Sequence, residues 1–207
     1  SILLGKLLDD PKLGIIKLQT QFETVLDKDL KPQTTTFCGA VPAFDYNSYR
    51  YREIAFEGTY AHDHFKGSIS SNDPNAMLKV DGALAKSNGK YQVDINSEVV
   101  NLAPMATNLS QKWQDAAFSG KINLSLKGRR LEDIEGQIRV SDMSLESPER
   151  SYTLENLLLD ARRENNEQTI TLNSDFGHMR INGSFDYASL PNSIMNMVRE
   201  KMPTIAN

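Results

Sequence analysis

Apolar and polar residues alternate with a period of two through most of the chain, which is the pattern of half-buried β-strands. Seven segments share one form, in which apolar residues two positions apart flank a glycine. These segments are Phe37–Val41, Phe56–Tyr60, Phe65–Ile69, Val80–Leu84, Phe118–Ile122, Ile134–Ile138 and Ile181–Phe185. Their spacing is irregular, so they indicate a recurring type of strand and not a solenoid of fixed period.

Short turn sequences predict how these strands pair. The expected two-residue loops are His62–Asp63, Asn88–Gly89 and Gly177–His178, and the facing pairs that they imply are Gly58 with Gly67, Gly82 with Ile95, and Leu172 with Gly183. In each case the apolar positions of the two strands fall on the same face without adjustment. The pattern therefore predicts a series of antiparallel hairpins.

Further strands are expected outside these hairpins. They are Gly14–Val25, Thr34–Ala43, Phe118–Leu126, Ile134–Val140 and Tyr152–Ala161, with Phe118–Leu126 and Ile134–Val140 joined through the residues around Arg129. Helical patterns are scarce, and only Pro104–Ala116 and Ser193–Met202 predict short helices. No linker or low-complexity run divides the chain, so residues 1–207 are expected to form one domain.

The expected sheet is amphipathic, and its apolar face requires a cover. Two short helices are too small to cover about ten strands, so two architectures remain open: a sheet folded over as a sandwich, or a sheet curled into a trough. Glycines on the apolar face favour bending. We therefore expect an all-β fold, a long antiparallel meander curled into a half-barrel-like trough with an apolar inner face and one or two short helices.

Composition excludes several classes of function. The 207 residues include 23 Lys and Arg against 27 Asp and Glu, for a net charge of −4, which argues against nucleic-acid binding because that needs a basic surface. No apolar run approaches the ~20 residues of a membrane span. The single cysteine, Cys38, excludes an internal disulfide. A compact chain of this size would expose roughly 9,700 Å².

Candidate chemical sites are sparse. His62 and His64 flank Asp63, but they fall at one hairpin tip and His178 at another, so we predict no metal site and no cofactor. We expect Cys38 to be a half-buried structural thiol. Carboxylates in polar, turn-like runs are expected to be solvated; they are the pairs Asp9–Asp10, Glu132–Asp133, and Glu164 near Glu167.

Three further features each have two interpretations. The segment Ser71–Asn75 has calcium-friendly oxygens, but its spacing favours a turn fixed by Asx hydrogen bonds and Pro74. The arginine doublets Arg129–Arg130 and Arg162–Arg163 suit either phospholipid headgroups or solvated strand ends. The apolar-face aromatics suit either core packing or the lining of an acyl-chain groove; they are Phe37, Phe56, Tyr60, Phe65, Tyr91, Phe118, Phe176 and Phe185.

The order of short motifs along the chain resembles the TamB translocation-and-assembly family, and its Bacteroidetes-type members in particular. The motifs are Leu7–Leu8, Asp10–Gly14, Phe44–Tyr46, Tyr49–Ile54, Phe56–Tyr60, Phe65–Gly67, Ser71–Asn75, Phe118–Gly120, Ile134–Ile138 and Ser189–Asn192. They extend over nearly the whole chain. They describe strands, bends and turns and contain no catalytic centre.

This resemblance implies a segment of a large envelope protein of the AsmA-like superfamily. Such a protein is anchored in the inner membrane, crosses the periplasm as a sheet with a hydrophobic groove, and meets an Omp85-family outer-membrane barrel protein. The implied function is non-enzymatic binding or conduction of phospholipid acyl chains between the two membranes. The residues expected to line the groove are Phe37, Val41, Ile54, Phe56, Gly58, Tyr60, Phe65, Gly67, Ile69, Val80, Leu84, Val93, Ile95, Phe118, Ile122, Leu124 and Ile138.

Two alternative functions remain open. One is a structural module for the insertion of outer-membrane barrel proteins, which would hold the barrel machine or accept strands at its sheet edges. The other is a carbohydrate-binding sandwich, which is disfavoured because the only tryptophan, Trp113, falls in an expected helix. Catalysis is not expected, because no nucleophile, base and orienting group can be assembled from the sequence.

Overall fold

The computed structural model describes residues 2–110, 115–130, 133–149, 151–164 and 167–183. These residues form twelve strands and one short helix. The elements are β1 (Ile2–Leu3), α1 (Leu4–Leu8), β2 (Leu13–Leu26), β3 (Pro32–Tyr46), β4 (Tyr49–Ala61), β5 (His64–Asp73), β6 (Ala76–Ser87), β7 (Lys90–Leu102), β8 (Ala117–Gly128), β9 (Glu135–Glu146), β10 (Ser151–Glu164), β11 (Glu167–Ser174) and β12 (Gly177–Gly183).

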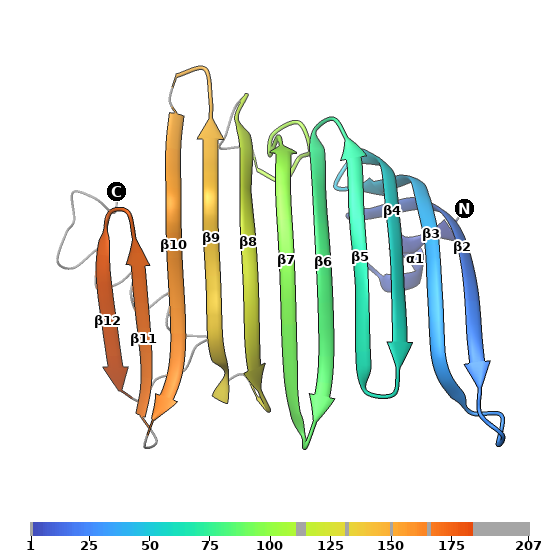
Figure 1. The fold of residues 1–207 in the computed structure, drawn as a ribbon. Coiled ribbons are helices and arrows are strands. Elements are labelled where there is room, and N and C mark those ends of the chain that lie inside the picture. The colour runs from blue at the N-terminus through green and yellow to red at the C-terminus, as the bar shows by residue number, and fades with distance from the viewer. Residues whose placement is uncertain (1, 111–114, 131–132, 150, 165–166, 184–207) are drawn as a thin grey trace.

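All twelve strands belong to one antiparallel sheet in which each strand pairs with its neighbours in the chain (Figure 1). β1 and β12 lie at opposite edges, so the sheet is not closed into a barrel. The predicted all-β meander is therefore confirmed. The sandwich alternative is excluded for the described strands, because each packs against its neighbours in the chain and the sheet does not fold back on itself. The chain exposes 14416 Å², well above the roughly 9,700 Å² of a compact protein of this mass.

Short turns fix the register of two hairpins as the sequence predicts. Across the His62–Asp63 turn, Gly58 faces Gly67, and across the Asn88–Gly89 turn, Gly82 faces Ile95. The second loop is built from left-handed residues, with φ of 50° at Asn88, which a two-residue hairpin of this type requires.

The predicted register of the last hairpin is wrong. The turn is Asp175–Phe176 and not Gly177–His178, so Leu172 faces Met179 instead of Gly183. The pairing moves by an even number of residues, which leaves every side chain on its expected face. The Asp175 carboxylate explains the position of the turn, because it accepts hydrogen bonds from the backbone N–H groups of Glu155 at 2.6 Å and Asn156 at 3.1 Å.

The helix predictions have mixed outcomes. In Pro104–Ala116, the described residues from 104 to 110 form turns and no helix, and residues 111–114, with Trp113, lie outside the described residues. The Ser193–Met202 helix also lies outside them. The observed helix, α1, contains five residues. Within the described part of the chain, no helix has the length and hydropathy of a membrane span.

Candidate functional site

One face of the sheet carries the apolar residues of almost every strand, and we call it the apolar face. Its best-defined feature is a row of facing residues that crosses β2 to β12 without a break. The row is Phe22, Phe37, Gly58, Gly67, Gly82, Ile95, Leu124, Ile138, Leu159, Leu172 and Met179. Strand alternation and these registers place all seventeen predicted groove-lining residues on this face. The sequence thus predicted which residues share a surface.

The apolar face is half-buried at most positions and is open to solvent at several positions of β2 and of β4 to β6. Among the predicted lining residues, the exposed ones are Tyr60, Phe65, Ile69 and Leu84, and Tyr60 is 51% exposed. At the β2 edge, Phe22 is 71% exposed. Soluble proteins rarely leave a contiguous apolar surface of this extent uncovered, and such a surface marks a site of interaction.

Aromatic rings fill part of the gap that the glycines leave. A Cβ atom on Gly58 would lie 2.5 Å from the Phe37 ring, and one on Gly67 would lie 2.9 Å from the Phe65 ring. These two rings are stacked, with centroids 6.2 Å apart. Gly82 is different, because its nearest neighbour would be a backbone oxygen 3.9 Å away. Phenylalanine rings therefore cover the row at two of its glycines and leave it open at the third, Gly82.

One end of the apolar face is closed by the loop between β7 and β8. We call residues 103–110 of this loop the strap. The strap folds back over three strands to the β3–β4 turn, where the Asn108 side-chain amide donates to the Asn47 carbonyl at 3.0 Å and Asn47 donates back to the Asn108 carbonyl. The Tyr51 hydroxyl donates to the Thr107 carbonyl at 3.4 Å. Thr107 has no exposed surface, so the strap forms a local core.

A buried carboxylate organises the strands beneath the strap. Asp73 is 1% exposed, and it accepts hydrogen bonds from the Tyr49 hydroxyl at 2.6 Å, from the Asn75 N–H at 2.9 Å and from the Arg52 N–H at 3.0 Å. Burial, and then the hydrogen bond to Asp73, raise the pKa of Tyr49 above its ordinary value. The Asx bond to Asn75 confirms the predicted turn.

Sequence reasoning missed the role of Asp73 in this cluster. The sequence feature that points to this role is a carboxylate at an apolar-face position: Asp73 lies two residues beyond Ser71 and four beyond Ile69 on the same strand. A charge at such a position requires buried hydrogen-bond donors. Its main partner, Tyr49, is 24 residues away in the sequence, so only the fold brings the two together.

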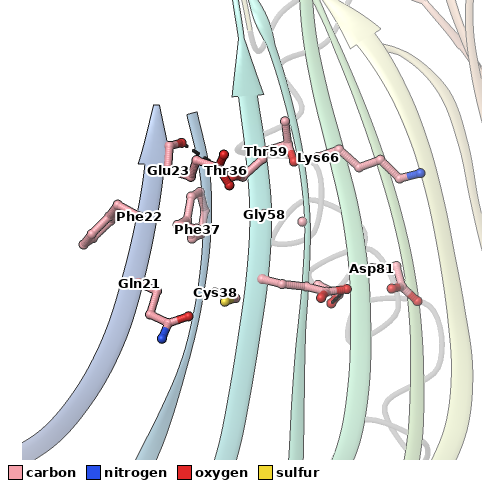
Figure 2. A pocket seen from close by; sticks show the side chains of 13 residues that line it. Gln21, Phe22, Glu23, Thr36, Phe37, Cys38, Gly58, Thr59, Lys66 and Asp81 are labelled. Atoms are coloured by element: carbon pink, nitrogen blue, oxygen red, sulfur yellow. Dashed lines mark hydrogen bonds between the residues drawn. The ribbon is translucent and has the colours of Figure 1, made fainter. Parts of the chain in front are cut away.

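A hollow of about 930 Å³ lies against the opposite, polar face over β2 to β6 (Figure 2). Alternation directs most of its lining side chains to this face; they include Gln21, Glu23, Cys38, Glu57, Lys66 and Asp81. The sequence did not predict a hollow here. The hollow combines three carboxylates with one lysine. The Ser68 hydroxyl donates to the Glu57 carboxylate at 3.4 Å, in a hydrogen bond that is exposed to solvent.

The prediction that Cys38 is half-buried is wrong, because the thiol is exposed. Cys38 alternates with Phe37 and Gly39, whose positions belong to the apolar face, so its side chain emerges among the polar residues of the hollow. The Figure 2 close-up shows it between Gln21 and Gly58.

The histidines are separated as the hairpin prediction requires. His62 and His64 lie at the β4–β5 hairpin and His178 lies on β12, at the far side of the sheet. Among the described residues, no three His, Cys, Asp or Glu side chains are grouped as a metal site. The absence of metal binding stays a prediction.

The arginine doublets and their acidic partners lie in a turn and near the end of a strand. Asp133 accepts hydrogen bonds from the backbone N–H groups of Arg130 at 2.6 Å and Arg129 at 2.9 Å, and these bonds lower its pKa. Arg162 pairs with Asp160 at 2.7 Å, and this hydrogen bond lowers the pKa of Asp160. Arg162 and Arg163 also line a second hollow of about 480 Å³ with Lys127. Headgroup binding by these arginines remains a prediction.

Comparison with family models, with curated proteins and with solved structures found no match to this chain.

Proposed function

We propose that this chain binds acyl chains of phospholipids on its apolar face and performs no catalysis. The observation that carries the proposal is the apolar face itself, a row of facing residues across eleven strands of a single open sheet. Side chains of this kind gain free energy when they leave water, at about 25 cal/mol per Å² of apolar surface. An acyl chain supplies that cover along its length without needing specific hydrogen bonds.

The glycine positions support a ligand that lies flat against the sheet. Gly82 presents bare backbone between Val80 and Leu84, so a flexible chain can approach the strand closely there. The adjacent Phe37 and Phe65 rings offer flat apolar walls. A strand with large side chains at every apolar-face position would hold a ligand farther from the backbone.

The wider setting of this activity follows the TamB resemblance. We place the chain in the periplasm as part of an inner-membrane-anchored envelope protein that moves phospholipid toward the outer membrane and contacts an Omp85-family barrel protein. The amphipathic open sheet supports this setting because a protein that carries lipid across water needs an apolar surface on a soluble frame.

Site-specific photocrosslinking tests acyl-chain binding. A photoreactive phenylalanine analogue is placed at Ile69, on the apolar face, or at its neighbour Ser68, on the polar face, and the protein is irradiated with vesicles of phosphatidylethanolamine and phosphatidylglycerol. We expect lipid adducts at Ile69 and none at Ser68. Equal labelling at both positions, or no labelling at Ile69 in folded protein, would contradict the proposal.

A second candidate function is supported by the open edges of the sheet. Among the described strands, β12 pairs only with β11, so its outer edge presents unpaired backbone groups that can accept another strand. In this role the chain would help to assemble outer-membrane barrel proteins. Strand peptides from such barrels would then protect β12 amides from hydrogen exchange, whereas acyl chains would leave those amides unchanged.

A further inference from the structure

The outer edge of β2 is unpaired over most of its length. β1 pairs with β2 only at Ile15 and Ile16, and the following residues, 17–26, have no partner on that side among the described strands. The edge is also apolar, since Leu18 is 43% exposed and Phe22 is 71% exposed. Long edges of this kind pair with further strands unless they are blocked.

The backbone of β2 shows which residues point outward. The carbonyl of Gln19 is directed at Gly39 of β3, and the carbonyl of Glu23 accepts a bond from the Thr36 hydroxyl at 3.5 Å. Backbone groups of successive residues alternate between the two sides of a strand. The outward groups are therefore those of Leu18, Thr20 and Phe22.

The sequence of this edge is complementary to itself when it is reversed. Residues 17–23 read Lys-Leu-Gln-Thr-Gln-Phe-Glu, so inversion about Thr20 exchanges lysine with glutamate, leucine with phenylalanine, and glutamine with glutamine. We propose that two copies of this chain pair antiparallel through β2, with a two-fold axis at Thr20. Residues whose numbers add up to forty then face each other.

Within residues 17–23 this register satisfies charge, burial and hydrogen bonding together. Lys17 of each copy faces Glu23 of the other on the polar face, which gives two ion pairs. Leu18 faces Phe22 of the other copy on the apolar face, which covers the most exposed ring of the strand. The outward backbone N–H and C=O groups also meet across the junction, as an antiparallel ladder requires. Those of Leu18 face Phe22 of the other copy, and those of Thr20 face its Thr20.

Beyond these residues, Thr24 and Val25 lie beside Ile16 and Ile15 of the other copy, where β1 pairs in the single chain. The two-residue β1 therefore moves off this edge when the copies pair.

Neighbouring registers of the two β2 strands lack the ion pairs or use a carboxylate that is already bonded. A shift by two residues in either direction places Lys17 opposite Val25 or Gln21, and so removes both ion pairs. A shift by four places Lys17 opposite Asp27, whose carboxylate already accepts hydrogen bonds from the N–H groups of Asp29 at 2.8 Å and Lys31 at 2.9 Å. Asp27 also lies beyond the end of β2.

The pairing joins the two sheets into one. A two-fold axis perpendicular to the sheet keeps the apolar faces of both copies on the same side, so the apolar face continues across the junction. A single pair of edges is a small interface, and we expect a reversible dimer with a dissociation constant in the micromolar range. This inference does not rest on lipid binding.

Sedimentation of the 207-residue protein over a wide concentration range, together with charge reversal, tests the interface. Lys17→Glu or Glu23→Lys replaces both symmetric ion pairs with like charges. Either variant should raise the dissociation constant of the dimer roughly tenfold. The double variant restores the pairing and should recover the wild-type affinity. Lys90→Glu, which makes the same charge change at an exposed site on β7, should have no effect.

Cysteine crosslinking tests the register in a Cys38→Ser background. Thr20→Cys places two thiols across the axis at a Cα separation of about 5.5 Å, within disulfide range, whereas Thr24→Cys places them eight residues out of register. We expect a rapid covalent dimer from the first variant only. A monomer at every concentration, no recovery in the charge-swapped double variant, or equal crosslinking from both cysteines would overturn the proposal.

Discussion

Replacing Asp73 with alanine should destabilise the end of the sheet beneath the strap more than any surface substitution. The change removes the acceptor of three hydrogen bonds and leaves the Tyr49 hydroxyl and the N–H groups of Arg52 and Asn75 without it. Hydrogen bonds to a charged group contribute about 1.5–3 kcal/mol each. Because water can enter beside the smaller side chain and solvate some of these donors, we expect a loss of about 3 to 4 kcal/mol.

Urea denaturation measures this loss. With a slope of about 2 kcal/mol/M, the unfolding midpoint should fall by roughly 1.5 to 2 M. Asp73→Asn keeps one acceptor oxygen but presents an amide donor, so it should lose about half as much. Asp81→Ala, which removes a half-exposed carboxylate paired with Lys79 at 3.3 Å, should cost less than about 1 kcal/mol.

Hydrogen exchange locates the effect. Amides of the strap and of the adjoining ends of β4 and β5 should exchange faster in Asp73→Ala, because their protection depends on the local cluster. If Asp73→Ala and Asp81→Ala had equal midpoints, the carboxylate would contribute no more than a surface charge. That result would refute the reasoning about the buried cluster.

Three further predictions follow from named contacts. Gly58→Val should lower stability by about 1–3 kcal/mol because a ring occupies the space of its side chain, whereas Gly82→Val, where that space is open, should be neutral or stabilising; equal midpoints in urea would contradict this difference. Because the pKa of Tyr49 is raised on folding, its contribution to stability is complete below the ordinary tyrosine pKa of about 10 and is lost as pH rises toward and through the folded-state value. The free energy of unfolding should therefore fall less with rising alkaline pH in Tyr49→Phe than in the wild type. An identical pH dependence in the two proteins would argue against this assignment. Excess zinc or nickel should leave the melting temperature unchanged, since a site at 100-fold ligand excess would add about 2.7 kcal/mol, and a rise would reveal a site that includes the histidines.

Local patterns were sufficient to predict the strands and two hairpin registers. The Asn88–Gly89 turn has one well-favoured conformation, and its flanking apolar positions agree with it, so the register of β6 and β7 follows from a few adjacent residues. The last hairpin was misplaced because Gly177–His178 is also a good turn sequence. The decisive contact there, between Asp175 and the backbone of β10, spans about twenty residues and has no local signature.

The number of layers could not be predicted from the same patterns. Period-two alternation shows that each strand has one apolar face, but it is the same for a sandwich and for a single open sheet. Most of the strap belongs to Pro104–Ala116, for which a short helix was expected. Its actual form depends on the Asn47–Asn108 bonds, which join turns 61 residues apart.

The candidate site was partly predictable for the same reason. Alternation assigned the apolar-face residues correctly, and it also places Cys38 on the polar face, although the cysteine was expected to be half-buried. The positions of the Phe37 and Phe65 rings over facing glycines depend on cross-strand geometry that only the structure supplies.

Native mass spectrometry of the protein purified after expression in a Gram-negative periplasm tests acyl-chain binding most directly. We predict bound species whose added mass matches phospholipid, confirmed by extraction, and a strong reduction when Ile69 and Leu84 are both replaced by asparagine. Replacing Lys66 and Lys79 on the polar face by asparagine should leave the bound fraction unchanged. Folded wild-type protein that carries no lipid, or equal loss in both double variants, would contradict the account.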